Sequence, residues 1–117
     1  MYTAEPFLPS ILSHNKAPTA YPPTRDHVYL PLGFLFAWLN ATYDDFFHDA
    51  IHRSAKRIRD VAIQDGQEIT HAPLYPNYAI FDTPLRDIYG ANVDKLHRLR
   101  KRVDPDNVME LTGGFKF

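Results

Sequence analysis

One segment of the chain, Val28–Trp38, is apolar on both faces if it forms a β-strand. Side chains alternate between the two faces of a strand, so every second residue points the same way. The larger face consists of leucine, phenylalanine and tryptophan side chains, and the flatter face includes Gly33 and Leu35. A strand that is buried on both sides has this pattern. The segment therefore predicts the main strand of a small sheet, with an edge or bulge at Pro31, which has no N–H to donate.

Two helices are predicted after this strand. Apolar residues recur at helical spacing over Thr42–Gln64, and Thr42 is a suitable N-cap. The second helix covers Val93–Arg102, with Asn92 as its cap and basic residues near its negative C-terminal end. These elements predict an α+β fold, in which a small antiparallel sheet is flanked by both helices on one face.

Shorter features connect these elements. The first 26 residues are rich in proline, which predicts a surface arm rather than a helix or a central strand. Thr83 and Pro84 predict the start of a short helical turn, with Thr83 as its N-cap and Pro84 at its first position. Asp104–Asn107 predicts a tight turn, because proline presets its second position, and Val108–Leu111 predicts a short strand. We therefore expect an arm over residues 1–26 and one domain over residues 27–117.

The predicted sheet is too small to bury the apolar strand. One long strand has at most two short neighbours, whereas an independently stable sheet usually needs three or more strands with a packed face. An uncovered edge and an uncovered apolar face both favour association. We therefore expect a homodimer, or a complex with a larger partner.

Charge and composition narrow the possible partners. The formal net charge is −1, so we expect neither nucleic acid nor an anionic membrane as a partner. No apolar stretch approaches the ~20 residues that cross a bilayer. The N-terminus also lacks the basic and apolar regions of a secretory signal, so a cytoplasmic location is expected. The chain contains no cysteine, which excludes disulfides, cysteine zinc sites and a cysteinyl-flavin bond.

The segment Tyr75–Asn92 concentrates hydrogen-bonding side chains. Tyr75, Asn77 and Tyr78 lie within four residues of one another. Tyrosine hydroxyls and an asparagine amide donate hydrogen bonds without carrying charge. In an apolar cleft such donors stabilise negative charge that develops on a substrate oxygen, which makes these three residues candidate catalytic groups. Alternatively, they satisfy buried backbone groups of an irregular loop. Both interpretations remain open.

Histidines supply further candidates. His71 is close to Tyr75 in sequence and is a candidate base, because histidine titrates near neutral pH; an exposed loop histidine is the alternative. His48 and His52 are four residues apart on one predicted helix and give only two metal ligands, so no metal site is predicted.

The candidate substrate-binding residues are Tyr29, Gly33, Leu35 and Tyr89, of which Tyr89 is also a candidate core residue.

The order of motifs in the C-terminal part resembles a known family. The motifs are Y-x-N-Y from Tyr75, Y-G-x-N from Tyr89, an L-x-x-L helix, D-P-x-N-V from Asp104 and a terminal G-G-F-K-F. In this order they resemble the C-terminal end of the berberine-bridge-enzyme-like FAD-linked oxidases, and the resemblance extends over most of the chain. It implies a flavoenzyme whose N-terminal domain binds FAD and whose second domain covers the isoalloxazine ring with an antiparallel sheet. By this resemblance, Tyr75, Asn77 and Tyr78 face the flavin or the substrate.

Several parts of that family are missing from this sequence. The FAD-binding domain is absent, together with its histidine and cysteine attachment sites, and there is no phosphate-binding glycine loop. We therefore expect no cofactor in this chain alone, and FAD only where a partner domain supplies it. The proline-rich arm directly after Met1 favours a free-standing domain over a truncated oxidase.

Two classes of function follow from these expectations. In the first, the chain acts on a small, natural-product-like molecule, either as a flavin-free cyclase, isomerase or dehydratase or as the partner subunit of a separate flavin domain. In the second, it is a non-catalytic small-molecule-binding or regulatory module, or a truncated remnant of an oxidase. A flavin-free enzyme forms product as a colourless protein, whereas a split oxidase turns yellow only with its partner. A binding module is stabilised by a ligand without forming product.

Overall fold

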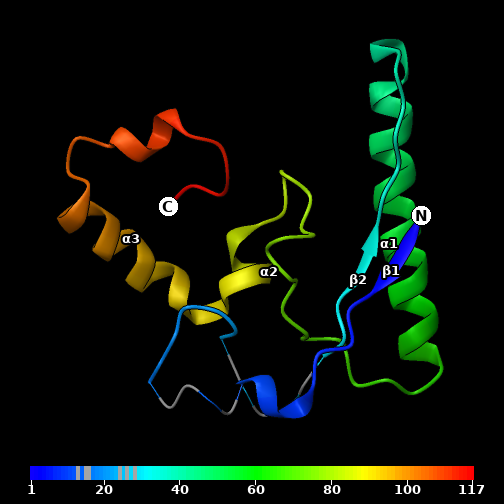
Figure 1. The fold of residues 1–117 in the computed structure, drawn as a ribbon, viewed down its shortest axis with the longest axis horizontal. Coiled ribbons are helices and arrows are strands. Elements are labelled where there is room, and N and C mark those ends of the chain that lie inside the picture. Colours follow the sequence, from blue (N-terminus) through cyan, green and yellow to red (C-terminus); the bar gives the residue numbers. More distant parts are fainter. Residues whose placement is uncertain (13, 15–16, 24, 26, 28) are drawn as a thin grey trace. The chain divides into compact units, whose positions relative to one another are not determined.

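A computed structural model describes the whole chain except residues 13, 15–16, 24, 26 and 28 (Figure 1). Its contacts divide the chain into two units. The first unit consists of Met1–Pro6 and Leu30–Ala72, and the second consists of Phe7–Tyr29 and Pro73–Phe117. Each unit is therefore assembled from two segments that are far apart in the sequence.

The first unit contains a two-stranded antiparallel sheet. Strand β1 (Tyr2–Ala4) pairs with strand β2 (Leu32–Phe34), and Thr3 lies opposite Gly33. The predicted strand Val28–Trp38 is thus wrong in its length, and its first residue lies outside the described part of the chain. The N-terminal arm also contributes a strand, which its proline content did not predict.

Backbone hydrogen bonds extend the pairing by one residue at each end. Met1 and Leu35 exchange two bonds, of 2.9 Å and 3.0 Å, and the Glu5 amide donates to the Pro31 carbonyl at 2.9 Å. Pro31 returns no bond because it has no N–H. The pairing therefore ends at the proline on one side and at Leu35 on the other.

Helix α1 (Asp44–Gln64) is the long helix of the first unit and follows a 3₁₀ turn over Ala41–Tyr43. The Asn40 side-chain oxygen accepts a hydrogen bond from the Thr42 amide at 2.9 Å. Asn40 therefore caps the helical segment, and the prediction of Thr42 as the cap is wrong, because the 3₁₀ turn moves the start upstream. Beyond the helix, Gly66 adopts φ 87°, a left-handed conformation that glycine reaches without strain.

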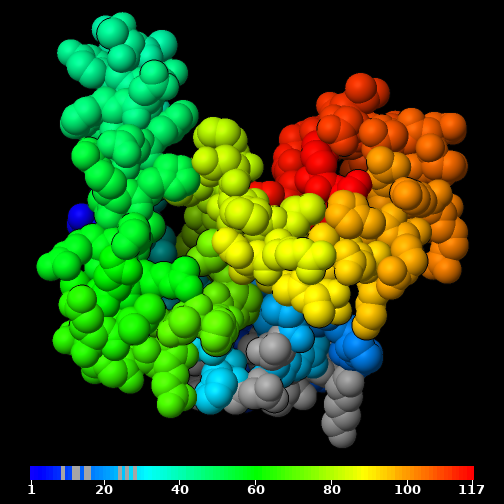
Figure 2. Space-filling model, turned by 180° about the vertical axis from the view of Figure 1, so that it is seen from behind, coloured from blue at the N-terminus to red at the C-terminus, as the bar shows by residue number. Residues whose placement is uncertain are grey.

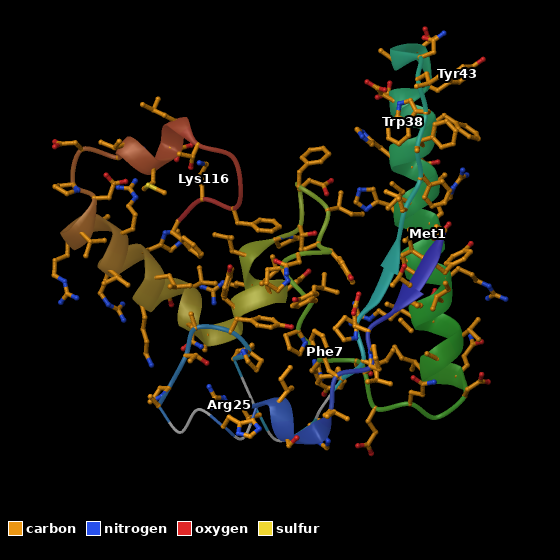
Figure 3. The ribbon with its side chains drawn as sticks, in the orientation of Figure 1. Met1, Phe7, Arg25, Trp38, Tyr43 and Lys116 are labelled. Carbon is orange, nitrogen blue, oxygen red and sulfur yellow. The ribbon has the colours of Figure 1, made fainter. Side chains whose placement is uncertain are left out.

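Trp38 connects the segment after β2 to α1 (Figure 3). Its ring stacks on Phe47 with the centroids 4.9 Å apart, and its indole N–H donates to the Asp44 carboxylate at 2.5 Å. Phe36 also contacts Phe47, at a centroid distance of 6.2 Å. This end of the predicted strand thus contacts the helix through its rings, which explains why it does not continue the sheet.

The second unit is built around the junction of two helices. Helix α2 (Leu85–Tyr89) and helix α3 (Val93–Val103) are joined by a 3₁₀ turn over Gly90–Asn92. Ile88 and Val93, one on each side of this turn, are the buried hydrophobic residues of the described chain, with exposed fractions of 0% and 5%. The core of this unit therefore lies at the junction.

The N-terminal arm contacts this junction. Gly90 ends α2 with φ 54°, and a Cβ atom at this position would lie 3.1 Å from Pro23. The Asn92 amide donates to the Ala20 carbonyl at 3.1 Å instead of capping α3, so that predicted cap is wrong. Thr83 does not cap α2 either, because the helix begins after Pro84 and no side chain caps it.

Asp104 organises the turn after α3. Its carboxylate accepts hydrogen bonds from the amides of Val108 at 2.8 Å and Met109 at 3.0 Å, while Asn107 adopts the left-handed conformation. The predicted turn at Asp104–Asn107 is therefore present. Val108–Leu111 forms a 3₁₀ helix, so the predicted strand is wrong, because the carboxylate binds the two N–H groups that open a helical turn.

The C-terminal tail folds back onto the helices of its own unit. In the space-filling view the tail (red) lies against α3 (orange) (Figure 2). The Arg100 side chain donates to the Phe117 carbonyl at 2.9 Å, and the Phe117 ring lies 5.2 Å from that of Tyr89. Lys116 donates to the carbonyls of Met109, at 2.6 Å, and of Thr112. The last residues thus close a loop against the α2–α3 junction.

The predicted α+β class is confirmed, with a small antiparallel sheet and two main helices. Because α1 belongs to the first unit and α3 to the second, the covering of one sheet face by both helices stays a prediction. Among the helices that the structure describes, none combines the length and the hydropathy needed to cross a membrane.

Replacing Asp104 by alanine tests the turn after α3. We expect Asp104→Ala to lower the free energy of unfolding by about 1 kcal/mol, the usual cost of losing a helix cap. Amide hydrogen exchange at Val108 and Met109 should accelerate at the same time. Asp106→Ala is the matched control, because Asp106 is an exposed carboxylate in the same turn. Equal effects of the two substitutions would contradict the capping role.

Candidate functional site

Tyr75 lies at the centre of an aromatic cluster in the second unit, which we call the Tyr75 cluster (Phe7, Tyr21, Tyr75 and Tyr78). The centroid of its ring is 5.4 Å from that of Phe7, 5.3 Å from that of Tyr78 and 6.0 Å from that of Tyr21. The first two contacts are edge-to-face, the arrangement that aromatic quadrupoles favour. The arm and the Y-x-N-Y motif therefore meet at Tyr75.

Asn77 controls the hydrogen bonding of the Tyr75 hydroxyl. The Asn77 side-chain amide donates to the Tyr75 oxygen at 2.8 Å. The phenolic oxygen is therefore an acceptor in this contact, and its own hydrogen points to a different acceptor. Asn77 is exposed and the exposed fraction of Tyr78 is 42%, so a small molecule can reach this side of the cluster.

Backbone hydrogen bonds fix the conformation of the Y-x-N-Y motif. The Tyr75 carbonyl accepts from the amides of Tyr78 at 3.0 Å and Ala79 at 2.9 Å, which closes a tight turn. The Leu74 amide donates to the Asp87 carbonyl of α2 at 2.8 Å. The structure thus brings three predicted site residues together in a turn that is attached to a helix of its own unit.

Tyr21 belongs to the cluster although the sequence did not single it out. Burial raises the pKa of the Tyr21 hydroxyl above its ordinary value of 10.0, and the neighbouring Tyr75 raises it further. The hydroxyl is therefore neutral over the physiological pH range. In the sequence, Tyr21 stands out only because it precedes two prolines. It lies in the N-terminal arm, for which the sequence predicts a surface position.

Two further predicted site residues, Tyr29 and Tyr89, lie in the second unit. Their described ring contacts are with residues outside the Tyr75 cluster. Tyr29 lies beside His27 at a centroid distance of 6.2 Å. Tyr89 is half-buried and packs against Phe117 of the tail. These contacts give both residues a place in the fold, and a binding role for them stays a prediction.

The remaining predicted site residues belong to the first unit. Gly33 is buried in the sheet, Leu35 is 57% exposed, and His71 is exposed. A shallow, open depression near the C-terminal end of α1 is lined by Arg57, Val61 and their neighbours, and it contains none of the predicted site residues. The structure therefore places Gly33, Leu35 and His71 in a different unit from the Tyr75 cluster.

The described residues contain no group of three or more histidine, cysteine, aspartate or glutamate side chains that is placed to hold a metal ion. His48 lies edge-on against the Trp38 ring at a centroid distance of 5.6 Å, so it has a packing role on α1.

Residues 74–113 match the family model described as berberine and berberine-like, abbreviated BBE. This segment is therefore similar to the BBE family. The match covers about a third of the chain and contains the Y-x-N-Y turn, α2, α3 and the Asp104 turn. The family resemblance seen in the sequence is thereby confirmed for this segment, whereas Phe7 and Tyr21 lie outside it. Neither a curated protein nor a solved structure matches the chain.

The match to the BBE family model raises the question of whether these residues fit FAD. Proteins commonly hold a pyrophosphate at a helix N-terminus, where free N–H groups and the helix dipole attract negative charge. All three α-helices that the structure describes carry aspartate in the first turn: Asp44 and Asp45 in α1, Asp87 in α2 and Asp94 in α3. These carboxylates repel a pyrophosphate. The N-termini of these helices therefore do not suit this part of FAD, and the absence of FAD from the chain alone stays a prediction.

Titration of the tyrosines tests the burial of Tyr21. Its raised pKa means that the folded state holds the proton more tightly than the unfolded state, so this contribution to stability is complete below pH 10.0 and is lost as the pH rises through the folded pKa. The ultraviolet absorbance of wild type should show a tyrosinate component that titrates above pH 10.0 and is missing in Tyr21→Phe. Tyr43→Phe, which removes an exposed hydroxyl, should keep it. If Tyr21→Phe instead loses a tyrosinate component that titrates near pH 10.0, the Tyr21 hydroxyl is exposed to solvent.

Proposed function

We propose that this protein is the substrate-side part of a BBE-type system and binds a small organic molecule at the Tyr75 cluster. The observation that carries this proposal is the hydrogen bond from Asn77 to the Tyr75 oxygen, which directs the phenolic hydrogen to another acceptor. A ligand oxygen is the acceptor that we propose.

The chemistry of the cluster favours an uncharged, unsaturated ligand. Three phenol rings and one phenyl ring offer flat apolar surfaces, which pack well against another planar ring. The polar groups that accompany them are hydroxyls and one amide, and these orient a ligand without requiring a charge on it. A ring that carries a carbonyl or phenol oxygen meets both requirements.

The same geometry supports chemistry that needs no flavin. When the Tyr75 oxygen accepts a hydrogen bond from Asn77, its own O–H becomes a stronger donor, because linked hydrogen bonds polarise one another. A strong neutral donor stabilises the negative charge that develops on a carbonyl oxygen during enolisation. Isomerisation, cyclisation and dehydration of an unsaturated carbonyl compound all pass through such a charge. Enolisation also needs a base that takes the proton from carbon; His71 stays only a prediction for that role, because it belongs to the first unit.

A second candidate function rests on the family match. Residues 74–113 match the berberine and berberine-like family model, which supports a link to FAD-linked oxidoreductases, while the aspartates at the helix N-termini disfavour the pyrophosphate of FAD. In this alternative a separate flavin domain supplies the cofactor, and the present chain supplies the substrate side of the site. A binding module without chemistry is the third outcome that the experiments below distinguish.

Removing the Tyr75 hydroxyl tests the first function. The colourless protein is incubated with a panel of unsaturated carbonyl and phenolic compounds; binding is followed by thermal shift and product formation by mass spectrometry. We expect Tyr75→Phe to keep the ring contacts but to reduce turnover by about 10²-fold or more, as the loss of one oxyanion donor does elsewhere. Asn77→Ala should have a smaller effect in the same direction, because it removes only the polarising bond.

Tyr43→Phe is the control for these substitutions, since it removes an exposed hydroxyl from the first unit. Ligand-induced stabilisation that Tyr75→Phe abolishes, with no product from wild type, would identify a binding module. Full binding and full turnover in Tyr75→Phe would rule out the Tyr75 cluster as the site.

Visible absorbance tests the second function. The purified chain mixed with FAD alone should stay colourless after desalting, because its helix N-termini carry negative charge. Addition of a flavin domain that forms a complex with the chain should yield a yellow complex with substrate turnover. A yellow chain in the absence of any partner would contradict the assignment of FAD to a separate domain.

A further inference from the structure

One edge of the two-stranded sheet has backbone groups that pair with nothing in the described chain. In an antiparallel pair, residues that exchange two hydrogen bonds alternate with residues whose N–H and C=O groups point outward. Met1 and Leu35 exchange bonds, and Gly33 occupies the next bonded position on β2. The N–H and C=O groups of Leu32 and Phe34 therefore point away from β1.

Two common protections of an edge strand, an outward-facing proline and charged side chains, are missing here. Native proteins commonly protect such edges with proline or charged side chains. Pro31 lies beside this edge, but its carbonyl accepts from Glu5, so its missing N–H is on the inner side, between the two strands. The sequence from residue 28 to residue 43 contains no aspartate, glutamate, lysine, arginine or histidine. Neither the backbone nor a charge blocks the outer edge of β2.

The apolar side chains along this edge are also uncovered. The exposed fractions are 63% for Leu30, 41% for Leu32 and 57% for Leu35. Helix α1 of the same unit buries none of its residues, and the buried hydrophobic residues described for the chain, Ile88 and Val93, both belong to the second unit. A two-stranded ribbon with so little core is marginal by itself.

We propose that two copies of this chain pair through the outer edges of their β2 strands. The product is a four-stranded antiparallel sheet with the strand order β1–β2–β2–β1, which exceeds the minimum for independent stability. An antiparallel strand edge is complementary to itself about a two-fold axis, so a second copy fits it without any further adaptation. The lack of charge between residues 28 and 43 also means that two identical edges meet without repulsion.

The alternation of inward and outward groups defines the register of this pairing. Outward-facing residues must lie opposite each other to exchange hydrogen bonds, which a two-fold axis at Gly33 achieves by placing Leu32 opposite Phe34 of the second copy. Gly33 then faces its own counterpart at a non-bonded position, where the Cα atoms approach to about 4.5 Å. Glycine brings no side chain of its own to this close approach. Leu30 and Phe36 extend the same pairing outward.

Two proline substitutions distinguish the two edges of the sheet. The N–H groups of Leu32 and Ala4 both point outward, one from β2 and the other from β1. Each substitution therefore removes one edge donor while sparing the bonds between the strands. By sedimentation and light scattering we expect wild type and Ala4→Pro to be dimers. Leu32→Pro should raise the dimer dissociation constant by about tenfold or more, since it removes a hydrogen-bond donor and leaves its acceptor unpaired.

Amide hydrogen exchange in the wild-type chain gives a test that does not depend on a variant. The amides of Leu32 and Phe34 should exchange slowly at high protein concentration and faster on dilution, whereas those of Tyr2 and Ala4 should exchange fast throughout. Far-ultraviolet circular dichroism shows whether Leu32→Pro retains its helices.

Several results would overturn the proposal: a monomeric wild type, a Leu32→Pro variant that stays folded and dimeric, or fast and concentration-independent exchange at Leu32 and Phe34. Loss of the dimer in Ala4→Pro alone would place the interface on β1 instead. Open-ended assemblies would show that the edges do not close about a two-fold axis. If the chain is a monomer and its β2 edge pairs with a strand of a different protein, that protein is the partner instead of a second copy.

Discussion

The turn between α2 and α3 is the point on which the second unit depends. Its two flanking residues, Ile88 and Val93, supply the buried apolar side chains that the structure describes. Full burial of such a side chain contributes roughly 1.5–3 kcal/mol, which is little against the entropy of ordering a chain segment. Polar contacts must therefore hold the other segments to this turn. The Asn92 amide binds the arm at Ala20, and Arg100 binds the tail at Phe117.

The family motifs of this unit have two different roles: some hold the fold together, and one presents polar groups to a ligand. In Y-G-x-N, Gly90 allows the close approach of Pro23, and Asn92 binds the arm. In D-P-x-N, Asp104 caps the 3₁₀ helix that leads into the tail. These motifs build the scaffold. Of the motifs in this segment, Y-x-N-Y places polar groups where a ligand can reach them, and the arm that the other motifs hold supplies Phe7 and Tyr21 beside it.

Local patterns in the sequence predicted both long helices, and they failed mainly where contacts with other parts of the chain determine the structure. The helices over 42–64 and 93–102 follow from apolar periodicity, and the structure has them within one or two residues. The strand was predicted too long, because the contacts of Trp38 with α1 compete with pairing in the sheet. Asn92 has the side chain of a cap, but a carbonyl 72 positions away takes its hydrogen bond. The Y-x-N-Y residues were found because they are adjacent in sequence, whereas Phe7 and Tyr21 reach Tyr75 only through the folded arm.

The neutrality of the Tyr75 cluster limits what it can recognise. Its described polar groups are phenols and one amide, and burial keeps the Tyr21 hydroxyl protonated. A carboxylate or phosphate ligand would give up its hydration there without gaining a formal positive charge, which is costly in a partly buried setting. A neutral ligand loses far less hydration and can still accept the Tyr75 hydrogen bond. The electrostatics of the site thus favour the same class of uncharged, oxygen-bearing ring compounds that its aromatic surfaces favour by shape.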